Sequence, residues 1–151
     1  MKNWKLFLLT GFAMLALSAC SGSSGGMNAS VLSADDVSMS NYLKTPVQVQ
    51  SILDDQKIAA TLNVLDVRTP AEFQAGCLNG AKNVDFEAAD FAAKISGLDK
   101  NASYLVYCRT GRRSGLAVSK LRELGFKNII ELKGGITAWI KDGEPVSQNC
   151  R

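Results

Sequence analysis

The segment SYLVYCRTGRRSGLAVSKL, residues 103–121, predicts a β-strand, a loop and a helix in direct succession. Ser103 to Tyr107 is a short β-branched and aromatic run of the kind that forms buried strands. A loop rich in arginine and glycine follows, and then Ala117 and Leu121 recur at helical spacing. Cys108 is therefore predicted at the junction where a strand ends and a loop begins.

The rest of the chain repeats this alternation of strand and helix. Further strands are predicted at Tyr42 to Lys44, Leu62 to Val67, Lys82 to Asp85 and Asn128 to Leu132. Further helices are predicted after Thr45-Pro46, after the capping box Thr69-Pro70-Ala71-Glu72, near Phe86 to Ile95, and from Ile136 to Asp142. This alternation predicts an α/β fold, a parallel sheet with helices on both faces. Ligands of such sheets bind at the carboxyl ends of the strands, where Cys108 is expected.

The N-terminal residues have the pattern of a secretory signal. Lys2 and Lys5 precede the apolar run Leu6 to Leu17, so residues 1–19 are predicted to be a signal peptide. Leu17-Ser18-Ala19-Cys20 resembles the lipobox of bacterial lipoproteins, in which the cysteine is lipidated. Residues 20–30 would then be a lipid anchor and a flexible Ser/Gly tether. The alternative is an ordinary signal peptide with a chance cysteine. We expect a periplasmic protein, and Ser21 rather than Asp favours the outer membrane.

Length and composition limit the remaining possibilities. Residues 31–148 have the size of a single domain. The net charge is only +3 and basic residues are spread along the chain except at residues 109–113, so a nucleic-acid surface is poorly supported. The chain has no histidine, which excludes a Cys-His catalytic pair. We also find no metal-ligand cluster in the sequence, and we predict no cofactor.

Three ordered segments resemble the rhodanese domain. They are VLDVRTPAEFQAGCLNGAKNV (residues 64–84), VYCRTGRRSGLAVSKL (106–121) and NIIELKGGITAWIKDGEPV (128–146). The resemblance covers about residues 45 to 146 and implies a single-domain rhodanese with a five-stranded parallel sheet. It also implies sulfurtransferase activity and a cysteine that carries sulfane sulfur as a persulfide. By this match the catalytic nucleophile is Cys108.

One segment departs from the family pattern. The family usually reads G-H-I-P-G-A where this chain has Gly76-Cys77-Leu78-Asn79-Gly80-Ala81, so His and Pro are both absent. Asn79-Gly80 preserves the turn. Because this turn precedes a strand, we expect it at the end of the sheet opposite Cys108, where it leaves catalysis unaffected.

The arginine loop explains how a cysteine without a histidine partner becomes reactive. A thiol attacks as its thiolate, which backbone N–H groups and the amino end of a helix starting near Ser114 stabilise. The same groups hold an anionic substrate. The predicted substrate-binding residues are Arg109, Thr110, Gly111, Arg112, Arg113 and Ser114, with Arg113 as the preferred anion contact.

Asp66 and Arg68 end the strand that, by the resemblance to the rhodanese domain, neighbours the one bearing Cys108, and both are expected to support the loop. Asp66 would accept N–H or arginine hydrogen bonds, and Arg68 would pair with Glu72. Gly134-Gly135 is predicted to meet a backbone requirement at the rim of the active site, and Trp139 to lie in the core.

The predicted function is sulfur transfer from thiosulfate or a similar small anionic donor. Cyanide or a thiol, including one on a protein, would accept the sulfur. A phosphatase or arsenate reductase is an alternative, but its loop resembles Cys-x5-Arg, and position 114 is Ser. A non-enzymatic persulfide carrier or a thiol-redox partner is another, although no Cys-x-x-Cys is present. A buried apolar role for Cys108 is the simplest alternative.

Two cysteines remain after Cys20 and Cys108. The final helix runs back from the active-site end, so we expect the tail to bring Cys150 to the end of the sheet where Cys77 lies. In an oxidising periplasm the two could form a disulfide.

Overall fold

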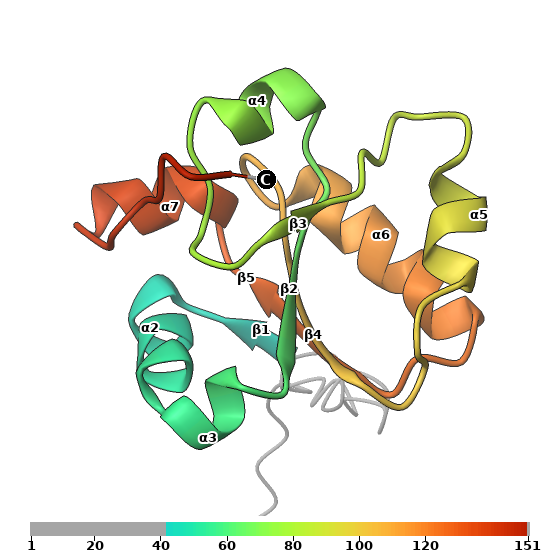
Figure 1. Ribbon diagram of the computed structural model, residues 1–151, viewed down its shortest axis with the longest axis horizontal. Coiled ribbons are helices and arrows are strands. Elements are labelled where there is room, and N and C mark those ends of the chain that lie inside the picture. The colour runs from blue at the N-terminus through green and yellow to red at the C-terminus, as the bar shows by residue number, and fades with distance from the viewer. Residues whose placement is uncertain (1–41, 151) are drawn as a thin grey trace, which may run out of the picture. The chain divides into compact units, whose positions relative to one another are not determined.

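The computed structural model describes residues 42–150, which form one five-stranded parallel sheet with helices on both faces (Figure 1). The strands are β1 (Leu43–Lys44), β2 (Leu62–Asp66), β3 (Lys82–Asn83), β4 (Ser103–Tyr107) and β5 (Asn128–Leu132), in the order β1-β5-β4-β2-β3. All four neighbouring pairs run parallel. The predicted fold class and sheet are therefore confirmed.

The helices cover both faces of this sheet. They are α2 (Pro46–Asp54), α3 (Gln56–Ala59), α4 (Pro70–Gln74), α5 (Phe91–Ser96), α6 (Arg112–Glu123) and α7 (Gly135–Lys141). In Figure 1, α5 and α6 lie on one side of the sheet, and α2, α3 and α7 lie on the other. The short helix α4 lies over the carboxyl end of the sheet, so it can contribute to a site at that end.

Local sequence signals set the start of two of these helices. Thr45 and Thr69 each form a capping box with the side chain three residues later, and each is followed by proline at the first helical position. Only three residues separate the end of β2 from the start of α4 at the second box. This short connection keeps Glu72 beside the carboxyl end of the strands.

The core is divided between the two faces by the alternation of side chains along β4. Tyr104 and Val106 pack with Phe91, Ala117 and Leu121 of the α5–α6 face. Leu105 and Tyr107 pack with Val49, Phe73, Ile136 and Trp139 on the opposite face. Trp139 is buried, as predicted, and its indole N–H donates to the carbonyl of Pro145.

Two helices begin at other residues than expected, one five residues later and the other two residues earlier. The helix expected from Phe86 begins only at Phe91, because Asp85 forms a turn in which its side chain accepts the N–H of Glu87. The helix expected to start near Ser114 begins at Arg112. Its N-cap is Gly111 with φ of +105°, a backbone conformation that glycine adopts readily and that turns the loop sharply into the helix.

The segment between α4 and β3 runs back along the sheet. The carbonyl of Gly76 accepts a hydrogen bond from Arg68, just past the carboxyl end of β2. Asn79 and Gly80 line a hollow together with Leu62 at the amino end of β2. The Asn79-Gly80 turn therefore lies far from Cys108, as expected, whereas Cys77 lies nearer the carboxyl end than predicted. The reason is that the chain must cross the height of the sheet before β3 begins.

Cys77 and Cys150 are joined by a disulfide bond. The tail after α7 also pairs with this segment, because Cys77 and Ser147 exchange backbone hydrogen bonds of 3.0 and 2.8 Å. Hydrogen bonds and a covalent bond therefore hold the C-terminal tail against the α2–α7 face.

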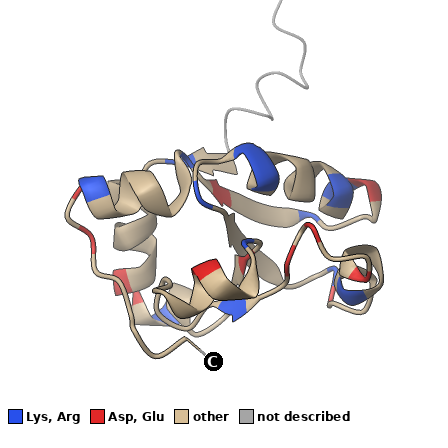
Figure 2. Cartoon of the chain, turned by 90° about the horizontal axis from the view of Figure 1, so that it is seen from above, with Lys and Arg blue, Asp and Glu red and all other residues tan. Residues whose placement is uncertain are grey.

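The predicted signal peptide, Cys20, the tether and the first residues of the predicted domain lie outside the described residues. Within residues 42–150 no helix is both long and apolar enough to cross a membrane. Basic and acidic residues are both scattered over the helices and loops of this part of the chain (Figure 2).

Candidate active site

Cys108 follows β4 directly and lies at the bottom of a loop that encircles its sulfur. The residue is only 1% exposed, on the α5–α6 face of the sheet. The backbone N–H of Gly111 donates to Sγ at 3.1 Å, and the hydroxyl of Ser114 lies 3.4 Å from the same sulfur. The Gly111 turn makes this possible, because it directs the N–H groups at the start of α6 toward the strand end.

These donors favour the thiolate. Burial alone raises the pKa of the Cys108 thiol, since it disfavours the charged form. Hydrogen bonds from the Ser114 hydroxyl and from the backbone N–H groups of Ser114, Gly111 and Thr110 outweigh burial and lower the pKa below the ordinary value. Backbone dipoles and one hydroxyl thus supply the stabilisation that a histidine gives in other cysteine enzymes.

The amino end of α7 fixes the backbone of the same loop. The N–H of Ile136 donates to the carbonyl of Cys108 at 2.9 Å, and that of Thr137 to the carbonyl of Arg109 at 3.1 Å. Gly135 makes this approach possible: its φ is +60°, and a Cβ atom there would lie 2.4 Å from the Cys108 carbonyl oxygen. The expected backbone role of Gly134-Gly135 is therefore a close contact with the nucleophile's own peptide.

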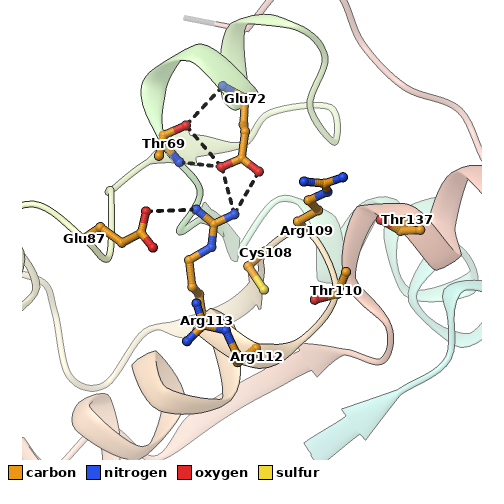
Figure 3. A pocket seen from close by; sticks show the side chains of 9 residues that line it. All are labelled: Thr69, Glu72, Glu87, Cys108, Arg109, Thr110, Arg112, Arg113 and Thr137. Atoms are coloured by element: carbon orange, nitrogen blue, oxygen red, sulfur yellow. Dashed lines mark hydrogen bonds and ion pairs between the residues drawn. The ribbon is translucent and has the colours of Figure 1, made fainter.

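A pocket of about 570 Å³ opens above Cys108 (Figure 3). Its lining comes from the start of α4 with its N-cap, the loop before α5, the Cys108 loop, the start of α6 and α7. It consists of Thr69, Glu72, Glu87, Cys108, Arg109, Thr110, Arg112, Arg113 and Thr137. Of the predicted substrate-binding residues, four line this pocket: Arg109, Thr110, Arg112 and Arg113. Gly111 and Ser114 instead face the sulfur from below.

The three arginines of the loop differ in whether a carboxylate of the protein pairs with them. Arg113 donates to both carboxylate oxygens of Glu72 at 2.8 Å and lies 3.5 Å from Glu87 (Figure 3). Its guanidinium is thus held between two carboxylates, which argues against the expectation that it is the preferred anion contact. Arg109 and Arg112 are exposed and make no ion pair within the described part of the chain. They are the cations that remain available to a substrate in this pocket.

The expected pairing of Arg68 with Glu72 is wrong. Arg68 forms a buried ion pair with Asp66 and also donates to the carbonyl of Gly76, while Glu72 binds Arg113. The physical reason is that Asp66 lies only two residues from Arg68 in the chain. Its carboxylate accepts both the backbone N–H and the guanidinium of Arg68, so the Arg68 side chain turns to Asp66 and not to Glu72.

Asp66 and Arg68 support the site from the opposite face of the sheet. Arg68 lies over the ring of Tyr107, 5.6 Å from its centroid, and the Tyr107 hydroxyl accepts the N–H of Leu78. Burial, and then the neighbouring Asp66 carboxylate, raise the pKa of Tyr107 far above its ordinary value. The backbone N–H of Val67 also donates to the Tyr107 carbonyl, which fixes the peptide just before Cys108.

Three acidic residues of the site were not predicted to act there. Glu72 was expected to cap a helix and to pair with Arg68 and not to bind Arg113, although the capping box also places its carboxylate at the carboxyl end of the sheet. Glu87 gave no sequence signal. Glu131 is a charged residue within the apolar strand NIIEL, a pattern that could have indicated a buried polar contact. It is 5% exposed, and its Oε1 lies 2.7 Å from the Ser114 hydroxyl.

The sequence of the chain is similar to those of known proteins. Residues 45–142 match the family model of the rhodanese-like domain. A sulfurtransferase of Allochromatium vinosum is 34% identical over 93 residues, 60% of this chain and 85% of that protein. Thiosulfate sulfurtransferase 16 of Arabidopsis thaliana is 31% identical over 117 residues, 71% of this chain and 98% of the relative.

A solved structure shows the same fold. The crystal structure of a rhodanese-related protein of Thermoplasma volcanium superposes with a TM-score of 0.60 at 30% sequence identity, over 70% of this chain and 97% of that one. The family model covers most of the part of the chain that the structure describes, from the first helix to the last. The chain therefore belongs to the family of proteins with a rhodanese-like domain, whose relatives named here are sulfurtransferases.

Proposed function

We propose that this protein transfers sulfane sulfur from thiosulfate, or a similar small anionic donor, to a thiophilic acceptor through a persulfide on Cys108. The observation that carries the proposal is the position of the Cys108 sulfur. It lies at the base of the pocket, receives the N–H of Gly111, and has a lowered pKa. A thiolate held in this way is a nucleophile that faces a cavity with room for a small anion.

The first half-reaction follows from these contacts. The Cys108 thiolate attacks the outer sulfur of thiosulfate, and a new S–S bond forms on the enzyme. The S–S bond of thiosulfate breaks, and sulfite leaves with its electron pair. Arg109 and Arg112 line the pocket without an ion pair in the described residues, so they are the groups that would hold the sulfonate end. The backbone N–H groups of the loop remain available to the persulfide sulfur.

In the second half-reaction an acceptor removes the outer sulfur. Cyanide attacks it, the S–S bond of the persulfide breaks, and thiocyanate leaves while Cys108 regains its thiolate. A thiol acceptor would react in the same way and give a persulfide of its own. In the cell we propose a thiol, on a small molecule or on a protein.

Phosphatase chemistry fits this loop less well. The guanidinium of Arg113 is held by Glu72 and Glu87 at the rim of the pocket and does not close a phosphate cradle over the sulfur. Ser114 occupies the position where a Cys-x5-Arg loop needs its arginine. We therefore propose sulfur transfer in preference to hydrolysis of phosphate esters.

We also propose that the protein acts in the periplasm, anchored to the outer membrane by lipid on Cys20. The sequence pattern of residues 1–30 supports this location, and the Cys77–Cys150 disulfide is compatible with an oxidising compartment. Labelled palmitate should enter the wild-type protein and not the Cys20→Ser variant. Equal labelling of both would reject the anchor.

Thiocyanate production from thiosulfate and cyanide tests the reaction. Cys108→Ala should lose this activity by about a thousandfold or more, because Cys108 is the only free cysteine within residues 42–150. The matched control is the double variant Cys77→Ala/Cys150→Ala, which removes two cysteines that lie outside the pocket and should keep the activity. Equal thiocyanate production by the wild type and Cys108→Ala would reject Cys108 as the nucleophile.

A further inference from the structure

A buried carboxyl group lies behind the nucleophile, on the side away from the pocket. Glu131 belongs to β5, and its neighbour on the same face, Ile129, packs in the α5–α6 core. Only 5% of Glu131 is exposed, although an isolated carboxylate is costly to bury. The reaction as proposed above gives this group no role.

Ser114 connects Glu131 to Cys108. This serine is fully buried, and its hydroxyl oxygen lies 2.7 Å from Glu131 Oε1 and 3.4 Å from Cys108 Sγ. A serine hydroxyl has one hydrogen to donate and lone pairs with which to accept. Ser114 therefore cannot donate to the carboxylate and to the thiolate at the same time. When it donates to one, it can only accept from the other.

We propose that Cys108 and Glu131 share one proton through the Ser114 hydroxyl. In the first arrangement the Cys108 thiol donates to Ser114, which donates to the Glu131 carboxylate. In the second arrangement the S–H bond is broken. The Ser114 oxygen has taken the proton of the thiol and has passed its former hydroxyl proton to Glu131. The Ser114 hydroxyl now donates to the Cys108 thiolate. No atom or charge is gained or lost, and every polar group has a partner in both arrangements.

The charges around the pair favour this sharing. Burial raises the pKa of Glu131, although the Ser114 hydrogen bond and the positive charge of Arg122 oppose it, so this carboxylate accepts a proton more readily than an exposed one. Burial lowers the pKa of Arg113, but the Glu72 and Glu87 carboxylates and then the Cys108 charge raise it, so Arg113 and Cys108 interact. The other charged groups near the sulfur lie around the pocket and are Arg109, Arg112, Glu72 and Glu87. Sharing leaves one negative charge in the buried site instead of two.

Glu131 touches no substrate in this scheme and is a positioning residue that acts through Ser114. The inference rests on the proposed function only because it assumes that the thiolate of Cys108 is the reactive form. Two interacting groups that share a proton titrate in two macroscopic steps, each visible at both sites. A purely structural carboxylate would not couple to the cysteine in this way.

Carbon-13 NMR of the Glu131 carboxyl group tests this coupling without a change at position 131. In the wild type, with the resonance assigned through its backbone connections, the carboxyl shift should move in two steps with pH. In Cys108→Ala it should move in one step at lower pH, because no thiol competes for the Ser114 hydrogen bond. Superimposable titrations of the two proteins would overturn the proposal.

The rate at which iodoacetamide alkylates Cys108 tests the same coupling at the cysteine. Mass spectrometry of the peptide that contains Cys108 measures this rate. The wild-type rate should rise with pH in two steps, and Glu131→Gln should show one, because an amide cannot take the proton. Glu123→Gln is the matched control: it removes an exposed carboxylate of α6 that pairs with Lys120, and it should titrate like the wild type. Two steps in Glu131→Gln, or one in the wild type, would overturn the proposal.

Neither readout uses a sulfur donor, so the two proposals can fail separately. A negative titration result leaves transfer through Cys108 intact. Conversely, thiocyanate production by Cys108→Ala would reject the proposed function even if the proton is shared. If Glu131→Gln does not fold, the NMR comparison of the wild type with Cys108→Ala decides alone.

Discussion

Cys108 and the Cys77–Cys150 disulfide place sulfur on opposite faces of the same sheet. Cys108 packs in the α5–α6 core, and Cys77 packs with the α2–α7 face. Both residues are 1% exposed. Cys108 is nevertheless surrounded by hydrogen-bond donors, whereas Cys77 is covered by Phe73, Leu78 and other apolar groups. Two cysteines that are equally buried thus differ in chemistry: Cys108 is a free thiol among hydrogen-bond donors, and Cys77 is part of a disulfide among apolar groups.

The difference shows that burial alone does not make a cysteine inert or reactive. Burial raises the pKa of a thiol, and at Cys108 the Ser114 hydroxyl and the N–H groups of Ser114, Gly111 and Thr110 reverse that effect. Those donors exist because a glycine turn starts α6 directly beneath the strand end. At the other site the backbone of Cys77 is occupied by its bridge to Ser147, and the sulfur serves as a crosslink.

The largest effect on stability is expected at the disulfide. Cys77→Ala/Cys150→Ala should lower the free energy of unfolding by about 4 kcal/mol, because it opens a loop whose ends are 73 residues apart. Denaturant melts without reductant measure this change. Thiocyanate production per folded molecule should stay at the wild-type level, and a parallel loss of activity would show that the two sulfur sites are coupled.

The next effect is expected at the contact between α7 and the nucleophile's peptide. Gly135→Ala should lower the free energy of unfolding by about 2 kcal/mol and reduce sulfur transfer, because its Cβ would meet the Cys108 and Arg109 backbone. Gly143→Ala is the control: its φ is also positive, at +83°, but no atom lies within 4 Å of the new methyl group. Equal effects of the two changes would contradict a specific contact.

A smaller effect is expected from the unpaired arginines of the pocket. Arg112→Ala should raise the KM for thiosulfate by about tenfold and change kcat little, because one exposed guanidinium contributes modestly to binding an anion. Steady-state kinetics at low salt measure this, and added salt should reduce the difference. An unchanged KM in an Arg109→Ala/Arg112→Ala double variant would show that the anion is held by backbone groups alone.

The smallest effect is expected in the pH dependence of stability. The thiolate of Cys108 has a lowered pKa in the folded protein, so the stability it contributes is present above the ordinary pKa of a free cysteine and is lost as pH falls through the lowered value. The unfolding free energy of the wild type relative to Cys108→Ala should therefore rise with pH across that window. A difference that falls with pH would mean that the folded protein disfavours the thiolate.

Much of the fold could be predicted because local signals coincide with the strands and helices. The run from Ser103 to Tyr107 and the capping box at Thr69 each lie where an element begins or ends in the structure. The helix expected from Phe86 failed because the Asp85 turn competes with helical hydrogen bonds over the same residues. The one strand adjacency that was expected, between the strands that end near Asp66 and Cys108, came from the family resemblance, since no local pattern specifies which strands are neighbours.

The residues of the site that are contiguous in the sequence could be predicted. The contacts between residues that lie far apart in the sequence could not. Cys108 and its loop are contiguous, so one segment indicated both the nucleophile and its donors. The pairing of Arg113 could not be predicted, because its partner Glu72 lies 41 residues earlier and meets it only in the folded state. The same holds for Glu131 and Ser114, which are 17 residues apart and approach because β5 lies beside β4.

The pH dependence of Cys108 alkylation in the native protein and in urea tests the central claim most directly. If the loop keeps this sulfur anionic, the native protein should reach half of its maximal alkylation rate at a lower pH than the unfolded chain. Each rate is read on the Cys108 peptide and divided by the maximal rate of the same state, which removes the effect of burial on the reagent's access to the thiol. Superimposable native and unfolded profiles would contradict the account, because the N–H groups of the loop would then do nothing to the thiol that they surround.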